Sequence, residues 1–136
     1  MLDHVGLNVS DYETGKAFYL QALAPLGITA VMEFPEWKAL GLGDGQKPYL
    51  WIHERGTPST STHVALVVPD TEAVDAFHAA ALAAGGTDNG APGLRPQYHA
   101  SYYAAFVIGP CGHNIEVVCH EPEGSVGGEP IARPEV

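Results

Sequence analysis

The sequence is poor in basic residues. Lysine and arginine together number six, against 16 aspartate and glutamate residues, and the formal net charge is −10. A nucleic-acid backbone or an anionic membrane surface would be repelled by such a field, and no basic stripe opposes it. We therefore expect neither nucleic acid nor a membrane as a partner.

Cysteines and long apolar runs are also scarce. The two cysteines, Cys111 and Cys119, are too few for a disulfide framework, so we expect two free thiols in a reducing cytoplasm. No stretch approaches the roughly 18 apolar residues of a membrane span. The first residues also lack the basic and apolar regions of a signal peptide. The expected location is cytoplasmic.

An internal repeat is the strongest feature that the sequence does contain. Residues 4–27 align without a gap with residues 63–86, and 12 of the 24 aligned positions are identical. Each copy begins with alternating apolar residues, the period of a strand with one buried face, and continues at helical spacing. Asp11 and Asp70, each followed by a glutamate, mark the start of a helix in each copy. The chain is therefore a duplication of one structural unit.

Strand-like segments follow each helix. The first copy has three and the second has two, and they cover residues 28–34, 37–42, 48–54, 102–108 and 114–120. Residues 88–101 hold two prolines and two glycines and predict a long loop, so the second copy shows one fewer clear strand. The best alignment of the two copies places Trp51 opposite Glu116.

These elements predict an α+β fold built from two tandem βαβββ modules. The first module would cover residues 2–54 and the second residues 62–120, joined by a linker at 55–61. Together they would form a single domain of residues 1–121, which suits a chain of 136 residues that is 46% hydrophobic. Residues 122–136 would form a tail rich in proline and glycine.

Two histidines and one glutamate are the candidate metal ligands. His4 and His63 are equivalent in the repeat, and each should point away from the apolar face of its strand. Glu116 lies between Ile115 and Val117, so it should point to the same side as the histidines. Two imidazoles and one carboxylate on one concave face are the donor set of a facial triad with open metal positions. The competing interpretation is that each histidine is an ordinary polar residue at a strand end, although a carboxylate on a buried sheet face needs a partner.

The same segments resemble the vicinal oxygen chelate superfamily. This superfamily includes glyoxalase I, extradiol ring-cleaving dioxygenases, fosfomycin-resistance thiol transferases and bleomycin-resistance proteins. The resemblance covers residues 2–120 and is carried by Asp3-His4-Val5-Gly6-Leu7-Asn8-Val9-Ser10-Asp11, Thr62-His63-Val64-Ala65-Leu66 and Gly109-Pro110-Cys111-Gly112-His113-Asn114-Ile115-Glu116. The last segment is similar to the family's Asp-Pro-Asp-Gly-Asn-x-Ile-Glu turn and strand, with Gly109 and Cys111 in place of two aspartates.

The resemblance implies a cupped mixed sheet with helices on its outer face. It also implies a divalent metal, Fe, Mn, Zn or Ni, held by His4, His63 and Glu116. The implied activity is that of a metal-dependent enzyme on a small substrate with two adjacent oxygens, by lyase, isomerase or ring-cleaving dioxygenase chemistry. The alternative is a metal-independent binding protein like those of bleomycin resistance. Similar chains form homodimers, in which His4 of one chain can join His63 and Glu116 of the other.

One departure from the family separates its branches. Glyoxalase I has a fourth protein ligand, an acid on the last strand of the first module, and the matching position here is Trp51. The remaining set of two histidines and one glutamate is therefore closer to the dioxygenase and thiol-transferase branches. Among the residues near the site, His99 or Tyr103 would serve acid–base chemistry. We expect Trp37, Trp51, His53, Arg95 and Tyr98 to line the substrate pocket, with ordinary packing as the competing interpretation.

Overall fold

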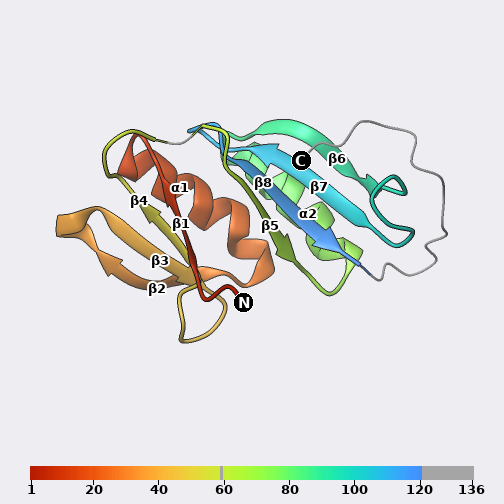
Figure 1. Cartoon of the computed structure of the whole chain (residues 1–136), viewed down its shortest axis with the longest axis horizontal. Coiled ribbons are helices and arrows are strands. Elements are labelled where there is room, and N and C mark those ends of the chain that lie inside the picture. The colour runs from red at the N-terminus through yellow and green to blue at the C-terminus, as the bar shows by residue number, and fades with distance from the viewer. Residues whose placement is uncertain (59, 121–136) are drawn as a thin grey trace.

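The computed structural model describes residues 1–58 and 60–120, and each half of the chain forms a βαβββ module (Figure 1). The first module consists of β1 (Val5–Asn8), α1 (Tyr12–Leu23), η1 (Ala24–Leu26), β2 (Thr29–Phe34), η2 (Pro35–Trp37), β3 (Ala39–Gly43) and β4 (Leu50–His53), where η denotes a 3-10 helix. The second module consists of β5 (His63–Val67), α2 (Thr71–Ala83), β6 (Thr87–Leu94), β7 (Tyr103–Ile108) and β8 (Asn114–Cys119). The predicted α+β fold is confirmed.

The strands form two four-stranded mixed sheets with matching order. The first sheet runs β1-β4-β3-β2 and the second β5-β8-β7-β6, and in each the first two strands are parallel. Gly6 pairs with Trp51, and Ala65 pairs with Glu116. Because Gly6 and Ala65 are equivalent in the repeat, Trp51 and Glu116 occupy the same position in the two sheets, as the alignment predicted.

Strand β6 corrects the prediction of a loop at residues 88–101. It pairs with β7 and forms the outer edge of its sheet, with register shifts between Asp88 and Gly90 and between Gly90 and Gly93. An edge strand tolerates Pro92 because one side of its backbone needs no ladder partner, and bulges accommodate glycines that would weaken a regular strand. The second module therefore has the same number of strands as the first.

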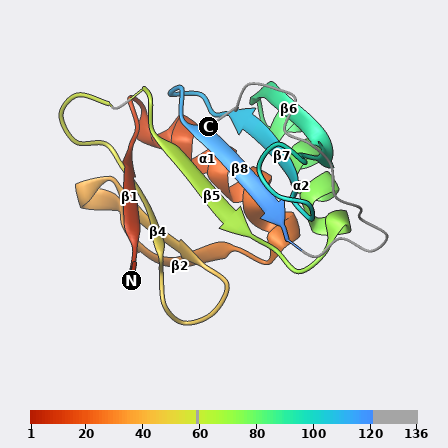
Figure 2. The same ribbon diagram turned by 45° about the vertical axis from the view of Figure 1, so that its right-hand side comes forward.

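The two helices bring the modules together. Asp11 accepts a hydrogen bond from the Thr14 amide at 2.9 Å, and Asp70 accepts one from the Ala73 amide at 2.8 Å, so both predicted N-caps are present. Helices α1 and α2 contact each other, and a single buried core draws on both modules. A groove lies where the open edge of β5 meets the start of β1, and Figure 2 shows β5 on the side of its sheet that faces the first module.

The structure also bears on the expectations about membrane spans, the C-terminal tail and the cysteines. In the described part of the protein, no helix combines the length and the apolarity needed to span a membrane. The expected tail at residues 122–136 lies outside the described residues. Cys111 and Cys119 are both free thiols, as expected.

Candidate functional site

A buried carboxylate lies at the centre of the second sheet. The Glu116 side chain is only 1% exposed, and its Oε1 atom lies 2.9 Å from Nε2 of His63. Its other oxygen accepts a hydrogen bond from the Tyr102 hydroxyl. Phe106 is paired with Glu116 in the sheet, and its ring lies against the His63 imidazole, with 6.3 Å between their centroids. An imidazole, a carboxylate and a phenol thus meet on the face opposite the main core.

The structure corrects the role expected for Tyr103. Its hydroxyl donates a hydrogen bond to Asp75 of α2 at 2.7 Å, so it lies on the helix side of the sheet, away from Glu116. Desolvation and the Asp75 carboxylate raise the pKa of Tyr103 to about 12, which stabilises the protonated phenol. The neighbouring Tyr102 reaches Glu116 instead. Alternation along β7 would have given this result, because Tyr102 shares a face with Phe106 and Tyr103 does not.

Three other expected residues lie around this second sheet. Arg95 lies over the Phe106 ring at 5.5 Å and donates hydrogen bonds to the carbonyl oxygens of Gly93 and Ala91. Tyr98 contacts the edge of Tyr102, with centroids 5.1 Å apart. His99 lies further out, where its Nδ1 accepts a hydrogen bond from the Ser101 amide. Arg95 and Tyr98 therefore belong to the Glu116 side, separate from the expected tryptophans.

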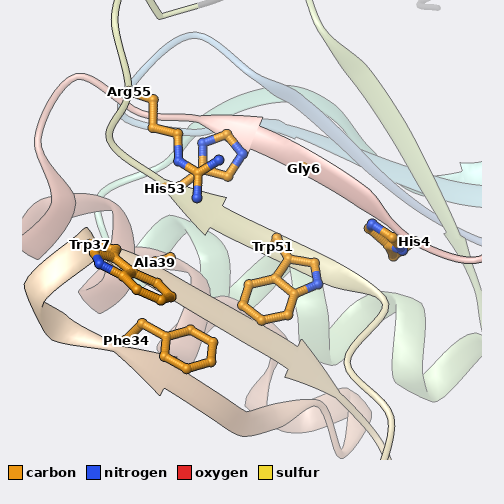
Figure 3. A pocket seen from close by; sticks show the side chains of 8 residues that line it. All are labelled: His4, Gly6, Phe34, Trp37, Ala39, Trp51, His53 and Arg55. Carbon is orange, nitrogen blue, oxygen red and sulfur yellow. The ribbon is translucent and has the colours of Figure 1, made fainter.

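The tryptophans line a pocket on the first sheet. Trp37, Trp51 and His53 are brought together as expected, and the pocket has a volume of about 410 Å³. Phe34 stacks on Trp51 with an interplanar angle of 9° and contacts Trp37 at a centroid distance of 5.1 Å. Figure 3 shows Trp51 between His4 at one end and His53 with Arg55 at the other. We call this hollow the aromatic pocket; its lining comprises His4, Gly6, Phe34, Trp37, Ala39, Trp51, His53 and Arg55.

Phe34 and Arg55 are members of the aromatic pocket that the sequence reasoning missed. Arg55 falls in the predicted linker, although it follows Trp51 and His53 at the two-residue spacing of one strand face. Its backbone is fixed to β1, because Oδ1 of Asn8 accepts a hydrogen bond from the Arg55 amide at 2.6 Å and the Asn8 amide group donates to the Arg55 carbonyl. Burial and the nearby Arg55 charge lower the pKa of His53, which favours the neutral imidazole.

His4 lies apart from the other two expected metal ligands. It lines the aromatic pocket, and its Nδ1 lies 2.7 Å from the Asp3 carboxylate, whereas His63 and Glu116 contact each other in the second sheet. Within residues 1–58 and 60–120 of one chain, no three His, Cys, Asp or Glu side chains are arranged to hold a metal ion. A single chain therefore provides the contacting His63 and Glu116 on one sheet, while His4 lies with the other sheet.

Comparison with known proteins identifies the family. Residues 1–117 match the model of the glyoxalase/bleomycin resistance protein/dioxygenase superfamily, and the chain belongs to that superfamily. None of the curated proteins searched matches the chain.

Solved structures agree with this assignment. A glyoxalase/bleomycin resistance protein from Albidiferax ferrireducens is 29% identical, with a TM-score of 0.73 over 88% of this chain and 98% of its own. A glyoxalase-related enzyme from Fulvimarina pelagi is 18% identical, with a TM-score of 0.67 over 88% of this chain and 87% of its own. A lactoylglutathione lyase from Agrobacterium tumefaciens is 16% identical, with a TM-score of 0.63 over 88% of this chain and 92% of its own. At these last two identities the likeness concerns the fold.

Proposed function

We propose that the protein is a divalent-metal-dependent enzyme acting on a small substrate with two adjacent oxygens. The observation that carries this proposal is the Glu116 carboxylate, which is 1% exposed and contacts His63 on the face of the second sheet opposite the main core. Removing a carboxylate from water costs several kcal/mol unless it is well partnered, so buried carboxylates are concentrated where function needs them. Imidazole and carboxylate are also ligands that suit Fe, Mn, Ni and Zn.

The donor set would be complete if two chains combined. One chain supplies the contacting pair His63 and Glu116, and His4 lies on its other module. We propose a cytoplasmic homodimer in which His4 of one chain completes the pair of its partner. The unpaired edges of β1 and β5 in the described sheets are consistent with a further surface meeting them.

The bound metal would supply Lewis-acid polarisation of the substrate oxygens. The protein's own groups would then position the substrate and control protons. Tyr102 donates a hydrogen bond to Glu116 and so fixes the orientation of that carboxylate. Trp51 replaces the carboxylate at the equivalent position of the first sheet, so the proposed set has three protein ligands and leaves positions open for substrate.

Metal binding can be tested by thermal unfolding of EDTA-treated protein with added Fe²⁺, Mn²⁺, Ni²⁺ or Zn²⁺. A ligand at one hundred times its Kd stabilises the folded state by about 2.7 kcal/mol, which for a chain of this length raises Tm by about 8–11 °C. Glu116→Gln should abolish the shift while keeping the side-chain shape. Glu72→Gln, an exposed residue with the same change of charge, should retain it. A wild-type protein that retains no metal and gains no stability from any of the four ions would refute the proposal.

Mixing two inactive variants tests whether the site lies between chains. A dimer of one His4→Ala chain and one Glu116→Gln chain would contain one intact site, made by His4 of the second chain and Glu116 of the first. Random pairing should then restore about a quarter of the wild-type metal content, because half of the dimers are mixed and each has one of two sites. A site within one chain would show no restoration at all.

The aromatic pocket supports a second candidate function, a metal-independent binding protein. The pocket lies entirely on the first module, and His4 is its only member among the three expected metal ligands. Ligand binding there that persists in EDTA and in Glu116→Gln, with no metal-dependent activity, would favour sequestration over catalysis.

A further inference from the structure

The charge of the aromatic pocket is opposite to that of the chain as a whole. The protein has 16 acidic residues against six basic ones, yet no carboxylate is among the residues that line this pocket. Its ionisable side chains are His4, His53 and Arg55. A pocket that binds a cation is lined by aromatic rings, either with a carboxylate beside them or with no charged group. The aromatic pocket instead combines its rings with the Arg55 guanidinium.

Arg55 differs from the other described cations in having no fixed partner for its charged end. The three described lysines are all ion-paired: Lys16 with Glu33, Lys38 with Glu54 and Lys47 with Asp3. Arg95 donates to backbone carbonyl oxygens. In residues 1–58 and 60–120, no carboxylate forms an ion pair with the Arg55 guanidinium.

The base of Arg55 is held rigidly even though its charged end is open. Asn8 forms hydrogen bonds with both the amide and the carbonyl of Arg55, and also donates to the Thr57 carbonyl at 2.9 Å. The side chain then extends over His53 at one end of the aromatic pocket (Figure 3). A guanidinium on a fixed backbone loses less freedom when it binds a carboxylate, which it matches in two parallel hydrogen bonds.

The aromatic rings of the pocket line the same hollow as this guanidinium. Trp37 is 62% exposed, an unusual state for the largest apolar side chain. Trp37 ends η2, and Lys38 closes this turn with a left-handed backbone (φ of 49°) and an amide that donates to the Pro35 carbonyl oxygen at 3.1 Å. Phe34 and Trp51 complete the apolar wall.

We propose that the aromatic pocket binds an aromatic carboxylate, with the ring against Trp37 and Trp51 and the carboxylate on the Arg55 guanidinium. The inference deepens the proposed function and rests on it for the ligand's role as a substrate, because His4 lies at the other end of the same pocket. Ligand binding itself needs only the first module. The acidic net charge of the chain would by itself favour a cationic ligand. In this pocket, however, a cationic aromatic ligand would meet the Arg55 guanidinium instead of a carboxylate.

Intrinsic fluorescence is a direct assay, because the chain has two tryptophans and both line the pocket. EDTA-treated full-length protein is titrated with benzoate, benzamide and phenyltrimethylammonium, which share one ring and differ in charge. Benzoate should bind about tenfold more tightly than benzamide, the difference between a charge-assisted and a neutral hydrogen bond. Phenyltrimethylammonium should bind more weakly than both.

Two variants with the same net charge locate the effect. Arg55→Gln should remove the preference for benzoate, whereas Lys16→Gln, which lies on α1 beside another pocket, should keep it. Equal benzoate affinity in wild type and Arg55→Gln, a preference for the cationic probe, or no saturable quenching by any probe would each overturn the inference. Because these titrations contain no metal, a failure here leaves the metal proposal standing, and loss of the metal proposal leaves benzoate binding intact.

Discussion

Gly86 provides a quantitative test of how the two modules are held together. An ideal Cβ at this position would overlap Cγ1 of Val107 and would lie 2.9 Å from both the Ala81 carbonyl oxygen and Cε1 of Phe18. Carbon atoms in favourable contact are about 3.5–4.0 Å apart, so an alanine must displace three groups at once. One of these is backbone, and another, Phe18, belongs to the first module. Gly86→Ala therefore forces apart the contact between α1 and the second module.

The expected cost is at the upper end of the range for overpacking. Adding a methyl group to a tightly packed interior costs about 1–3 kcal/mol. Because Gly86→Ala causes three clashes at once, we expect a loss of about 3 kcal/mol in the free energy of unfolding. In a protein of this length each kcal/mol corresponds to about 3–4 °C, so Tm should fall by about 10 °C. Urea unfolding should give the same free-energy change if the transition is two-state.

Gly27 is the matched control, since the repeat aligns it with Gly86. Its φ is 75° and no atom lies within 4 Å of an added Cβ, so Gly27→Ala incurs only the cost of a left-handed alanine, about 1 kcal/mol. The stability loss caused by Gly86→Ala should be smaller in a Val107→Ala background than in the wild type, whereas the loss caused by Gly27→Ala should be the same in both backgrounds. If Gly86→Ala costs no more than Gly27→Ala, or if its cost is the same in both backgrounds, the described packing between the modules is wrong.

Two further predictions concern His53 in the aromatic pocket. Gly6→Ala places a Cβ 2.8 Å from Nε2 of His53, the far end of a movable side chain. The free energy of unfolding should therefore change by less than about 1 kcal/mol. Fluorescence quenching by benzoate should weaken, because the His53 ring shifts into the pocket. Arg55→Gln should raise the pKa of His53, by removing a nearby positive charge, but leave it below its ordinary value because burial remains; an NMR titration of the imidazole Cε1–H signal measures this. Since the folded-state pKa is depressed, His53 contributes stability above its unfolded pKa that is lost as pH falls through the folded value, and Arg55→Gln should reduce that loss.

The repeat explains why much of the fold was predictable. Alternating apolar residues specify which face of a strand is buried, and a carboxylate at the N-cap specifies where a helix starts, so β1, β5, α1 and α2 follow from local patterns. Strand β6 does not follow, because its glycines and Pro92 have loop propensity and its formation depends on pairing with β7. Such pairing is a tertiary effect that no local window contains.

The sequence predicts which face of a sheet each site residue occupies, but it does not predict all of the side chains that the residue contacts. The side of the sheet that Glu116 occupies follows from its neighbours, and His63 is its contact as the repeat suggested. That Tyr102 reaches Glu116 and Tyr103 does not follows from the alternation of β7 only when this alternation is extended to the start of the strand. His4 is a different case, because its separation from Glu116 depends on how two modules pack through their helices, which no residue pattern in either module specifies.

The two sheets carry different side chains at positions that the repeat makes equivalent. Trp51 and Glu116 occupy the same position, yet Trp51 is flanked on its face by His53 and Arg55, and Glu116 by His63 and Tyr102. One copy has thereby become an apolar wall with a positive end, and the other a carboxylate–imidazole pair. The aromatic rings and the buried carboxylate thus lie on different sheets. If the aromatic pocket binds a carboxylate as proposed, Trp51→Glu should weaken benzoate binding in EDTA, because it removes one of the rings and places a second carboxylate among His4, His53 and Arg55.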